Sequence, residues 1–311
     1  MKAIQFFAIT ALGAALFASC SNQEELATGS YPSDNLIRVT AGVNNDMTRS
    51  DEAVTPTSLT KNFSLTVVNN TNDKFSYANE IFSLKGTEWS CGKNLLWQNL
   101  ATQVEIVALY PAADASTFSG VYSKENKSYG TITYGVNPDQ STAAEADDLL
   151  LYHNANFVPE KDLQDGKLNI LFNHAFCRVD IEVTIGTEFN ATDGLAVNPI
   201  QGISVGGTQI AADINLASAS PTITAKGDAA SITPTPGTFT PATSESAKAV
   251  ARYSCIVIPQ TATLKVLLHT SDREFEWTGS QMTLESGKQY TLQLNMKKSA
   301  TARKFILRER K

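Results

Sequence analysis

The sequence predicts an all-β protein composed of two β-sandwich domains in tandem. Three observations lead to this prediction. Apolar and polar residues alternate in short segments, as in half-buried strands. Gly, Asn, Asp and Pro separate these segments, as turn residues do. No long stretch places apolar side chains at the helical spacing of ~3.6 residues. The alternating segments are Leu36–Val43, Phe63–Val67, Val104–Tyr110, Leu168–Ile185, Tyr253–Ile258, Thr263–His269 and Tyr290–Met296.

The N-terminus has the features of a bacterial lipoprotein signal. Lys2 precedes an almost entirely apolar run, Ala3–Phe17, which is shorter than the ~20 residues that span a bilayer. Ala18 and Ser19 are small residues directly before Cys20, in a pattern that resembles a lipobox. We therefore expect cleavage before Cys20 and lipid attachment to its thiol. An ordinary secretory signal is the alternative.

The residues after Cys20 bear on location. The acidic pair Glu24–Glu25 resembles the signal that sends some lipoproteins to the outer face of the outer membrane. A merely solvated linker is the alternative reading of this pair. The net charge of −6 is spread along the chain, so it gives no electrostatic reason to bind nucleic acid.

The first alternating segment after the signal is Leu36–Val43. In a strand, Ile37, Val39, Ala41 and Val43 share one face, so this face is expected to be buried. A polar stretch, Pro159–Gly166, later interrupts the strand pattern and is the predicted domain boundary. The predicted divisions are residues 1–19 for the signal, 20–49 for a lipidated propeptide, and 50–162 and 163–311 for the two domains.

The cysteines do not predict a disulfide framework. Three remain after Cys20, and an odd number cannot pair completely. Cys177 alternates with Val179 and Ile181, so it is expected to be a small buried residue. A Cys177–Cys255 bridge stays an alternative, because sequence alone does not place the two sulfur atoms.

Motifs with catalytic spacing lack the context that catalysis needs. Gly202-Ile203-Ser204-Val205-Gly206 has the spacing of a hydrolase nucleophile elbow, which requires a strand before it and a helix after it. The residues that follow predict a turn and another strand, so Ser204 is not expected to be a nucleophile. Gly86–Lys93 is a poor phosphate loop, with the wrong glycine spacing and Asn94 in place of Ser or Thr. We expect no active site and no cofactor.

The histidines and acidic residues do not form a metal motif. His153, His174 and His269 stand far apart, and none has a second ligand at metal-binding spacing. His174 is expected to be a structural residue near the start of a strand. Asp147 and Asp148 precede an apolar run and are expected to lie in a solvated turn rather than to act as a pair of glycosidase carboxylates.

Aromatic residues leave a sugar-binding function open. An exposed platform of such residues stacks against sugar rings, and core packing is the alternative. Core packing is favoured for Trp97 and Tyr110, which lie about a hairpin apart. The aromatic residues considered are Trp89, Trp97, Tyr110, Tyr122 and Tyr129.

Several segments, taken in order, resemble the fimbrillin family of pilins from Gram-negative oral and gut bacteria. The resemblance covers most of the chain, and the series is more specific than any single segment. This chain continues after its last alternating segment to Lys311, further than many relatives. The segments are the N-terminal signal, Asp46–Arg49, Trp89 with Leu96–Trp97, Val104–Pro111, Asp147–Tyr152, Leu168–Val179, Ile256–Gln260 and Leu284–Leu292.

The resemblance implies two transthyretin-like β-sandwich domains and assembly of lipidated subunits into a fimbria on the cell outer membrane. In relatives, an arginine-specific protease removes the N-terminal strand. Here Leu36–Val43 would be that strand and Arg49 the processing site, since Arg38 lies within the strand. The donor that replaces it would be Thr301–Leu307 or Tyr290–Met296.

The resemblance also implies the partners and leaves two other functions open. The partners would be other fimbrillin subunits, the outer membrane through the lipid, and a host or bacterial surface ligand. One alternative is a monomeric surface lipoprotein that binds glycans or host ligands, which requires exposure of Trp89 and Trp97. The other is a hydrolase, which requires Ser204 on an elbow beside a histidine.

Overall fold

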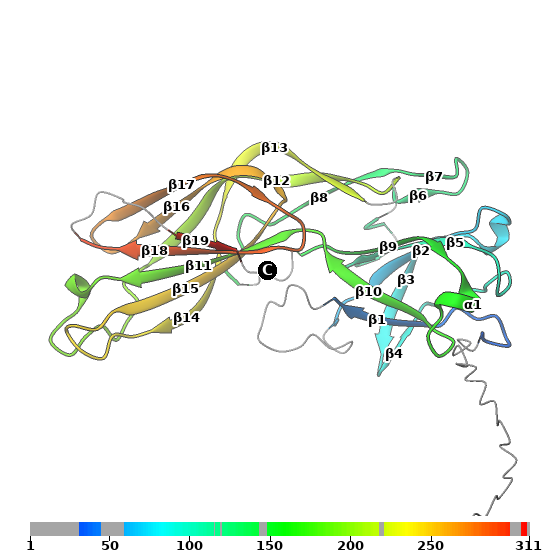
Figure 1. The fold of residues 1–311 in the computed structure, drawn as a ribbon, viewed down its shortest axis with the longest axis horizontal. Helices are drawn as coiled ribbons and strands as arrows, with labels where there is room; N and C mark the ends of the chain where they lie inside the picture. Colours follow the sequence, from blue (N-terminus) through cyan, green and yellow to red (C-terminus); the bar gives the residue numbers. More distant parts are fainter. Residues whose placement is uncertain are drawn as a thin grey trace, which may run out of the picture.

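The computed structural model is an elongated, almost entirely β-stranded protein (Figure 1). The described residues contain one short α-helix, α1 (Pro159–Asp162), and the 3-10 turns η2 (Asp73–Phe75) and η4 (Thr187–Phe189). The predicted all-β class is confirmed. The structure describes residues 31–44, 59–114, 116–118, 120–142, 148–217, 221–298 and, for the backbone only, 306–309.

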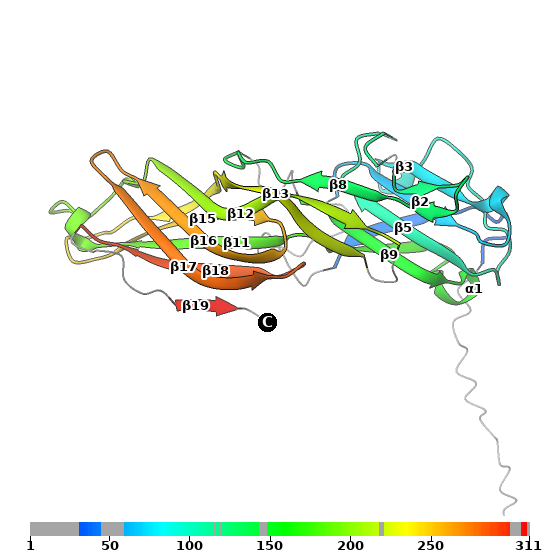
Figure 2. The same ribbon diagram turned by 90° about the horizontal axis from the view of Figure 1, so that it is seen from above.

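The first structural unit is a closed barrel at one end of the molecule (Figures 1 and 2). Its strands come from two separate parts of the sequence. In barrel order they are β1 (Val39–Val43), β10 (Leu168–His174), β9 (Leu150–Phe157), β5 (Val104–Tyr110), β2 (Phe63–Val68), β3 (Tyr77–Lys85) and β4 (Glu88–Ser90).

The second unit contains two sheets that pack face to face. One has the order β14 (Thr235–Thr240), β15 (Ala249–Val257), β11 (Cys177–Ile185), β18 (Gln289–Met296), β19 (Ile306–Glu309). The other has the order β13 (Thr222–Ile232), β12 (Gly202–Asn215), β16 (Gln260–His269), β17 (Glu274–Leu284), and β8 (Thr131–Gly135) also pairs with β12. A small hairpin, β6 (Tyr122–Ser123) with β7 (Ser128–Tyr129), lies apart from both sheets.

Two hydrophobic cores correspond to these units. The barrel core contains Ile106 and Ala108, whereas the sandwich core contains their neighbours Val107 and Leu109. Successive side chains of β5 therefore enter different cores, because a strand presents alternate residues to opposite faces. Burial on both faces explains why Val104–Tyr110 is a nearly continuous apolar run.

The polar stretch Pro159–Gly166 does not separate the two cores. It contains α1, and the strand after it, β10, still packs in the barrel core through Leu168, Ile170 and Phe172. The chain passes to the sandwich core at Ala175 and Phe176. In the other direction, β8 precedes the polar stretch but pairs with β12 of the sandwich. Each unit thus includes segments from both sides of the predicted boundary.

Candidate functional site at the first strand

Strand β1 closes the barrel, and it is held very differently along its two edges. Along one edge it pairs in parallel with β10 over five residues, from Val39 opposite Leu168 to Val43 opposite Phe172. Along the other edge it pairs with β4 through a single residue pair, Val39 with Trp89. A main-chain bond from Ile37 N to the Leu95 carbonyl oxygen, 2.9 Å long, adds to this second edge. The seam between β1 and β4 is therefore the weaker side of the strand.

The inward face of β1 is apolar, as its sequence pattern predicts. Ile37, Val39, Ala41 and Val43 all belong to the barrel core and are 1–8% exposed. This prediction is confirmed. The core is rich in aromatic rings, and the Phe63 ring lies 4.8 Å from that of Trp89, 5.3 Å from Phe82 and 5.6 Å from Phe172, measured between centroids. Removal of β1 would therefore uncover an aromatic core.

The outward residues of β1 make polar contacts. Thr40 Oγ1 donates to Asn169 Oδ1 on β10 at 3.1 Å. Arg38, just before the strand, forms an ion pair with Asp34 at 2.6 Å. The hydrogen bond from Arg38 lowers the pKa of the Asp34 carboxyl to about 2. Because this pair is exposed, we assign it little stability. The buried face and the β10 ladder hold β1 in place.

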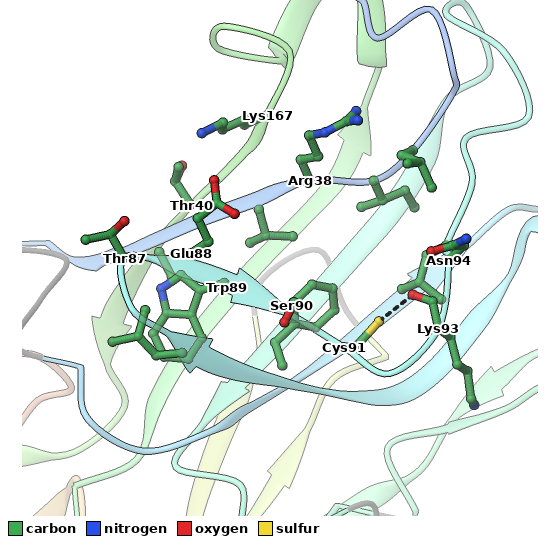
Figure 3. Close-up of a pocket in the computed structure, with 17 residues that line it drawn as sticks. Arg38, Thr40, Thr87, Glu88, Trp89, Ser90, Cys91, Lys93, Asn94 and Lys167 are labelled. Carbon is green, nitrogen blue, oxygen red and sulfur yellow. Dashed lines mark hydrogen bonds between the residues drawn. The ribbon is translucent and has the colours of Figure 1, made fainter.

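A cavity of about 330 Å³ lies in the seam between β1 and β4 (Figure 3). Its apolar wall includes Ile37, Val39, Phe82, Trp89 and Leu95. Figure 3 shows Ser90 and Cys91 across the seam from Thr40 and Arg38. The remaining lining residues are Leu36, Arg38, Thr40, Ala41, Leu84, Thr87, Glu88, Ser90, Cys91, Lys93, Asn94 and Lys167.

The two predicted modification sites, Cys20 and Arg49, lie outside the described residues. The structure describes β1, which precedes Arg49 in the chain, and the residue after it, Asn44, whose main-chain N–H donates to the Phe172 carbonyl oxygen at 2.8 Å. Sequence reasoning missed that Leu95–Trp97 pairs with residues 35–37, the segment just before β1. The two segments are about sixty residues apart in the chain, and their pairing leaves no local pattern.

Ser204 lies within a long strand rather than on an elbow. It belongs to β12, pairs with Leu267 of β16, and is followed by further strand residues to Asn215. The expectation that no helix follows is confirmed. The segment that begins at Gly86 is also not a phosphate loop. Gly86 has φ +65° and forms the tight turn that joins β3 to β4.

Each histidine pairs with a single acidic residue. His153 Nε2 lies 2.7 Å from Glu105 Oε1, His269 Nδ1 lies 3.0 Å from Glu274 Oε1, and His174 Nδ1 lies 2.5 Å from Asp148 Oδ2. Within the described ranges no three metal-ligating side chains gather. One prediction needs correction. Asp148 is 4% exposed and pairs with His174, so it does not lie in a solvated turn, whereas Asp147 lies outside the described residues. His174 is the last residue of β10 and lies three residues before β11 begins at Cys177, near a strand start as expected.

The tryptophans predicted as a possible sugar platform are core residues. Trp89 is 7% exposed and Trp97 2% exposed, and Trp97 stacks on Phe157 at 5.5 Å. Tyr110 packs near Phe172, at 6.1 Å between ring centroids. Tyr122 and Tyr129 face each other across the β6–β7 hairpin at 5.1 Å. The exposure that a glycan-binding function required of the two tryptophans is not found.

The three described cysteines are free thiols. Cys177 of β11 lies opposite Val257, and Cys255 of β15 lies opposite Val179, so both are buried in the sandwich core as small residues. This confirms the prediction for Cys177. Burial raises the pKa of the Cys255 thiol to about 12 and also raises that of Cys177. Cys91 is half-buried in the wall of the seam cavity.

In a Cys20→Ala protein, we expect an aromatic disulfide reagent at pH 8 to react with one thiol, Cys91. Cys177 and Cys255 should remain protonated and inaccessible, since the thiolate is the reactive form. In denaturant, all three thiols should react with the reagent. Absorbance of the liberated thiolate counts the reacted groups. Rapid reaction of three thiols in the native protein would contradict the burial of the sandwich cysteines.

Among the described residues, no helix has the length and apolar character needed to cross a membrane.

The chain resembles several solved structures in fold. A candidate cell adhesion protein from Bacteroides uniformis is 16% identical, with a TM-score of 0.55 over 90% of this chain and 98% of that one. Another, from Bacteroides ovatus, is 13% identical, with a TM-score of 0.55 over 89% and 96% of the two chains. At these identities the likeness concerns the fold.

The family assignment comes from comparison of the amino-acid sequence with models of protein families. No functionally curated protein matches the chain significantly. The model of the fimbrillin-like family matches residues 48–305, which include all strands of the barrel except β1 and both sheets of the sandwich up to its last strand. This match indicates a fimbrial protein of the cell surface and not an enzyme. The chain belongs to the fimbrillin-like family.

Proposed function

We propose that this protein is a fimbrial subunit, structural or adhesive, that is exported as an outer-membrane lipoprotein and polymerises by strand exchange after cleavage at Arg49. The observation that carries the proposal is that β1, the first described strand of the chain, completes the core of the barrel. We also propose that barrel and sandwich represent the two transthyretin-like units of the family.

The energetics of β1 suit a cap that is stable until the chain is cut. Burial of Ile37, Val39 and Val43 stabilises the barrel by roughly 5–9 kcal/mol, as an upper estimate. Without β1, the edge of β10 loses its parallel partner, and the aromatic core around Phe63 opens to solvent. An extended segment from another subunit restores both the main-chain bonds and the apolar contacts.

The two candidate donors differ in what their release would cost. Tyr290, Leu292, Leu294 and Met296 of β18 are all buried in the sandwich core, between β11 and β19. Release of β18 would destroy that core. We therefore propose the segment after it, Thr301–Leu307, as the donor. Figures 1 and 2 show that β18 runs away from the barrel. A donor leaving that end would join subunits head to tail, which generates open filaments.

Cys20→Ala should abolish lipid attachment and membrane retention. A single acyl chain binds a membrane only marginally, so a stable anchor requires the multiply acylated cysteine of a lipoprotein. Cells grown with labelled palmitate measure the modification, and fractionation measures retention. Cys91→Ser provides the matched control and should be labelled normally. Undiminished labelling of the Cys20→Ala protein would contradict this assignment.

Cleavage after Arg49 should convert a monomeric precursor into a polymer. The Cys20→Ala precursor is treated with an arginine-specific protease and examined by electrophoresis without boiling. We expect a ladder for this protein and none for its Arg49→Ala derivative. Arg49→Lys is the matched control: it resists the arginine-specific enzyme but is cut by trypsin, so only trypsin should produce its ladder.

Product masses must show that Arg303 and, in the trypsin digest, Lys304 are uncut, because cleavage there would divide the donor Thr301–Leu307. Clean cleavage at Arg49 with no ladder would contradict strand exchange and favour a monomeric ligand-binding lipoprotein. A ladder that appears equally in the Arg49→Ala protein would show that this arginine is not the processing site.

A further inference from the structure

We propose that the cavity in the seam between β1 and β4 is an initiation site, where the C-terminal segment of a second copy binds before β1 leaves. This inference rests on the proposed strand exchange and adds a step to it. It names the place on the uncut or newly cut subunit that first recognises the incoming chain.

The arrangement of main-chain pairs makes the seam the accessible side of β1. The β10 edge is fully paired over β1, whereas β4 contributes only Trp89. An incoming strand that approached from β10 would have to break the ladder first. One that approaches from β4 meets a cavity already lined by Ile37 and Val39 on one side and Trp89 and Leu95 on the other.

The chemistry of the cavity suits an extended peptide. At about 330 Å³ it is at the lower end of the range for ligand pockets, ~300–1,000 Å³. Its wall offers Phe82, Trp89 and Leu95 to an apolar side chain. Ser90 Oγ is buried and has no hydrogen-bond partner in the described part of the protein. Buried hydroxyls are nearly always paired, so this oxygen is available to a main-chain group of an incoming strand.

Stepwise replacement avoids a large barrier. Spontaneous release of β1 would expose its three buried side chains, together with Ile37 just before it, and would break its ladder before anything replaced these contacts. A strand that first occupies the seam can instead replace β1 one residue pair at a time. Each ~1.4 kcal/mol removed from the barrier accelerates exchange about tenfold. Occupation of the cavity therefore controls the rate of exchange, while β1 controls the stability of the precursor.

The occupant we infer is Phe305–Leu307 with its flanking residues. It belongs to the chain after β18, Ser299–Lys311, which includes the four-residue edge strand β19. Phe305 and Leu307 alternate along the sequence, as Ile37 and Val39 do in β1. Extended at ~3.3 Å per residue, this segment would reach about 40 Å beyond its own sandwich, far enough to enter a neighbouring subunit.

Cys91 provides a reporter inside the cavity. We would incubate the uncut Cys20→Ala precursor with a peptide of residues 299–311 that carries Leu307→Cys, activated as a disulfide with an aromatic thiol. The Cys91 thiolate attacks the peptide sulfur and the aromatic thiolate leaves, so no oxidant is needed. The expected result is a mixed disulfide with Cys91, detected by mass spectrometry and absent in the Cys91→Ser protein. A peptide in which Phe305 and Ile306 are also replaced by Ser should give at least tenfold less. Equal yields from both peptides would overturn specific binding.

The rate test uses the protein after cleavage at Arg49. A bulky maleimide on Cys91 should slow capture of the unmodified peptide at least tenfold, whereas a small methylthio group should change it less than twofold. A lower melting temperature of the maleimide adduct would show that the bulky group expels β1 instead of filling the cavity. Thr87→Trp then provides a second test, because Thr87 lies at the exposed rim of the cavity and its replacement should also slow capture. Equal rates for all forms would overturn the initiation site but leave strand exchange intact. No capture by any cleaved form would overturn both.

Discussion

The Val39→Asp precursor is expected to polymerise without proteolysis. Val39 is 5% exposed, lies in the barrel core and pairs with both Leu168 and Trp89. A carboxylate there would be buried without a partner, and the free energy needed to bury it exceeds the stabilisation that the contacts of β1 provide. The strand should therefore leave the barrel, and a donor from another copy should take its place. Electrophoresis without boiling should show a ladder from the uncut protein. Thermal unfolding of the remaining monomer should show a lower melting temperature than that of the unchanged precursor.

Thr40→Asp is the matched control for this prediction. Thr40 is the next residue of β1, but it is half-buried on the outward side, where its hydroxyl meets Asn169. The added charge can remain in water, so β1 should stay in place and the protein should stay monomeric. A ladder from both variants would mean that any charge in β1 has this effect. A stable monomer from Val39→Asp would mean that β1 is not the cap.

The face of β1 was predictable from the sequence because strand alternation is local. Its partner was not, since β10 lies 129 residues further along the chain, as the contact between Thr40 and Asn169 illustrates. The same locality explains why the polar stretch does not coincide with the change from one core to the other. A polar stretch indicates exposure, and Glu160–Asp162, Gln164 and Asp165 are indeed exposed, but exposure does not determine which core the next strand joins.

One readable signal for the division was missed. The segment from Leu168 to Ile185 alternates on either side of residues 175 and 176, and the buried positions change parity between its two parts. Leu168, Ile170 and Phe172 are even-numbered and fill the barrel core, whereas Cys177 and Val179 are odd-numbered and fill the sandwich core. A change of parity means that the strand has turned over. The sequence therefore contains the crossing between the two units at residues 174–176.

Asp148 shows the other limit of local reading. Two aspartates before an apolar run are typical of a solvated turn, yet Asp148 is buried beside His174. The pair lies where β10 ends, next to the main-chain bond from Ala175 N to the Leu149 carbonyl oxygen, 2.8 Å long. It therefore connects the start of β9 to the end of β10, at the crossing from the barrel to the sandwich. Only the fold brings these two residues together.

Asp148→Ala should therefore lower the free energy of unfolding by about 3–5 kcal/mol, because it leaves the imidazole of His174 buried without its partner. His174→Ala should have a similar effect, and the double variant should lose clearly less than the sum of the two. Glu274→Ala, which breaks the exposed pair with His269, is the matched control and should cost less than about 1 kcal/mol. Denaturant titration of the four proteins gives these differences. Strictly additive losses at Asp148 and His174 would show that the two side chains do not stabilise each other, whereas a coupling of about 1 kcal/mol or more would confirm that their contact holds the start of β9 to the end of β10.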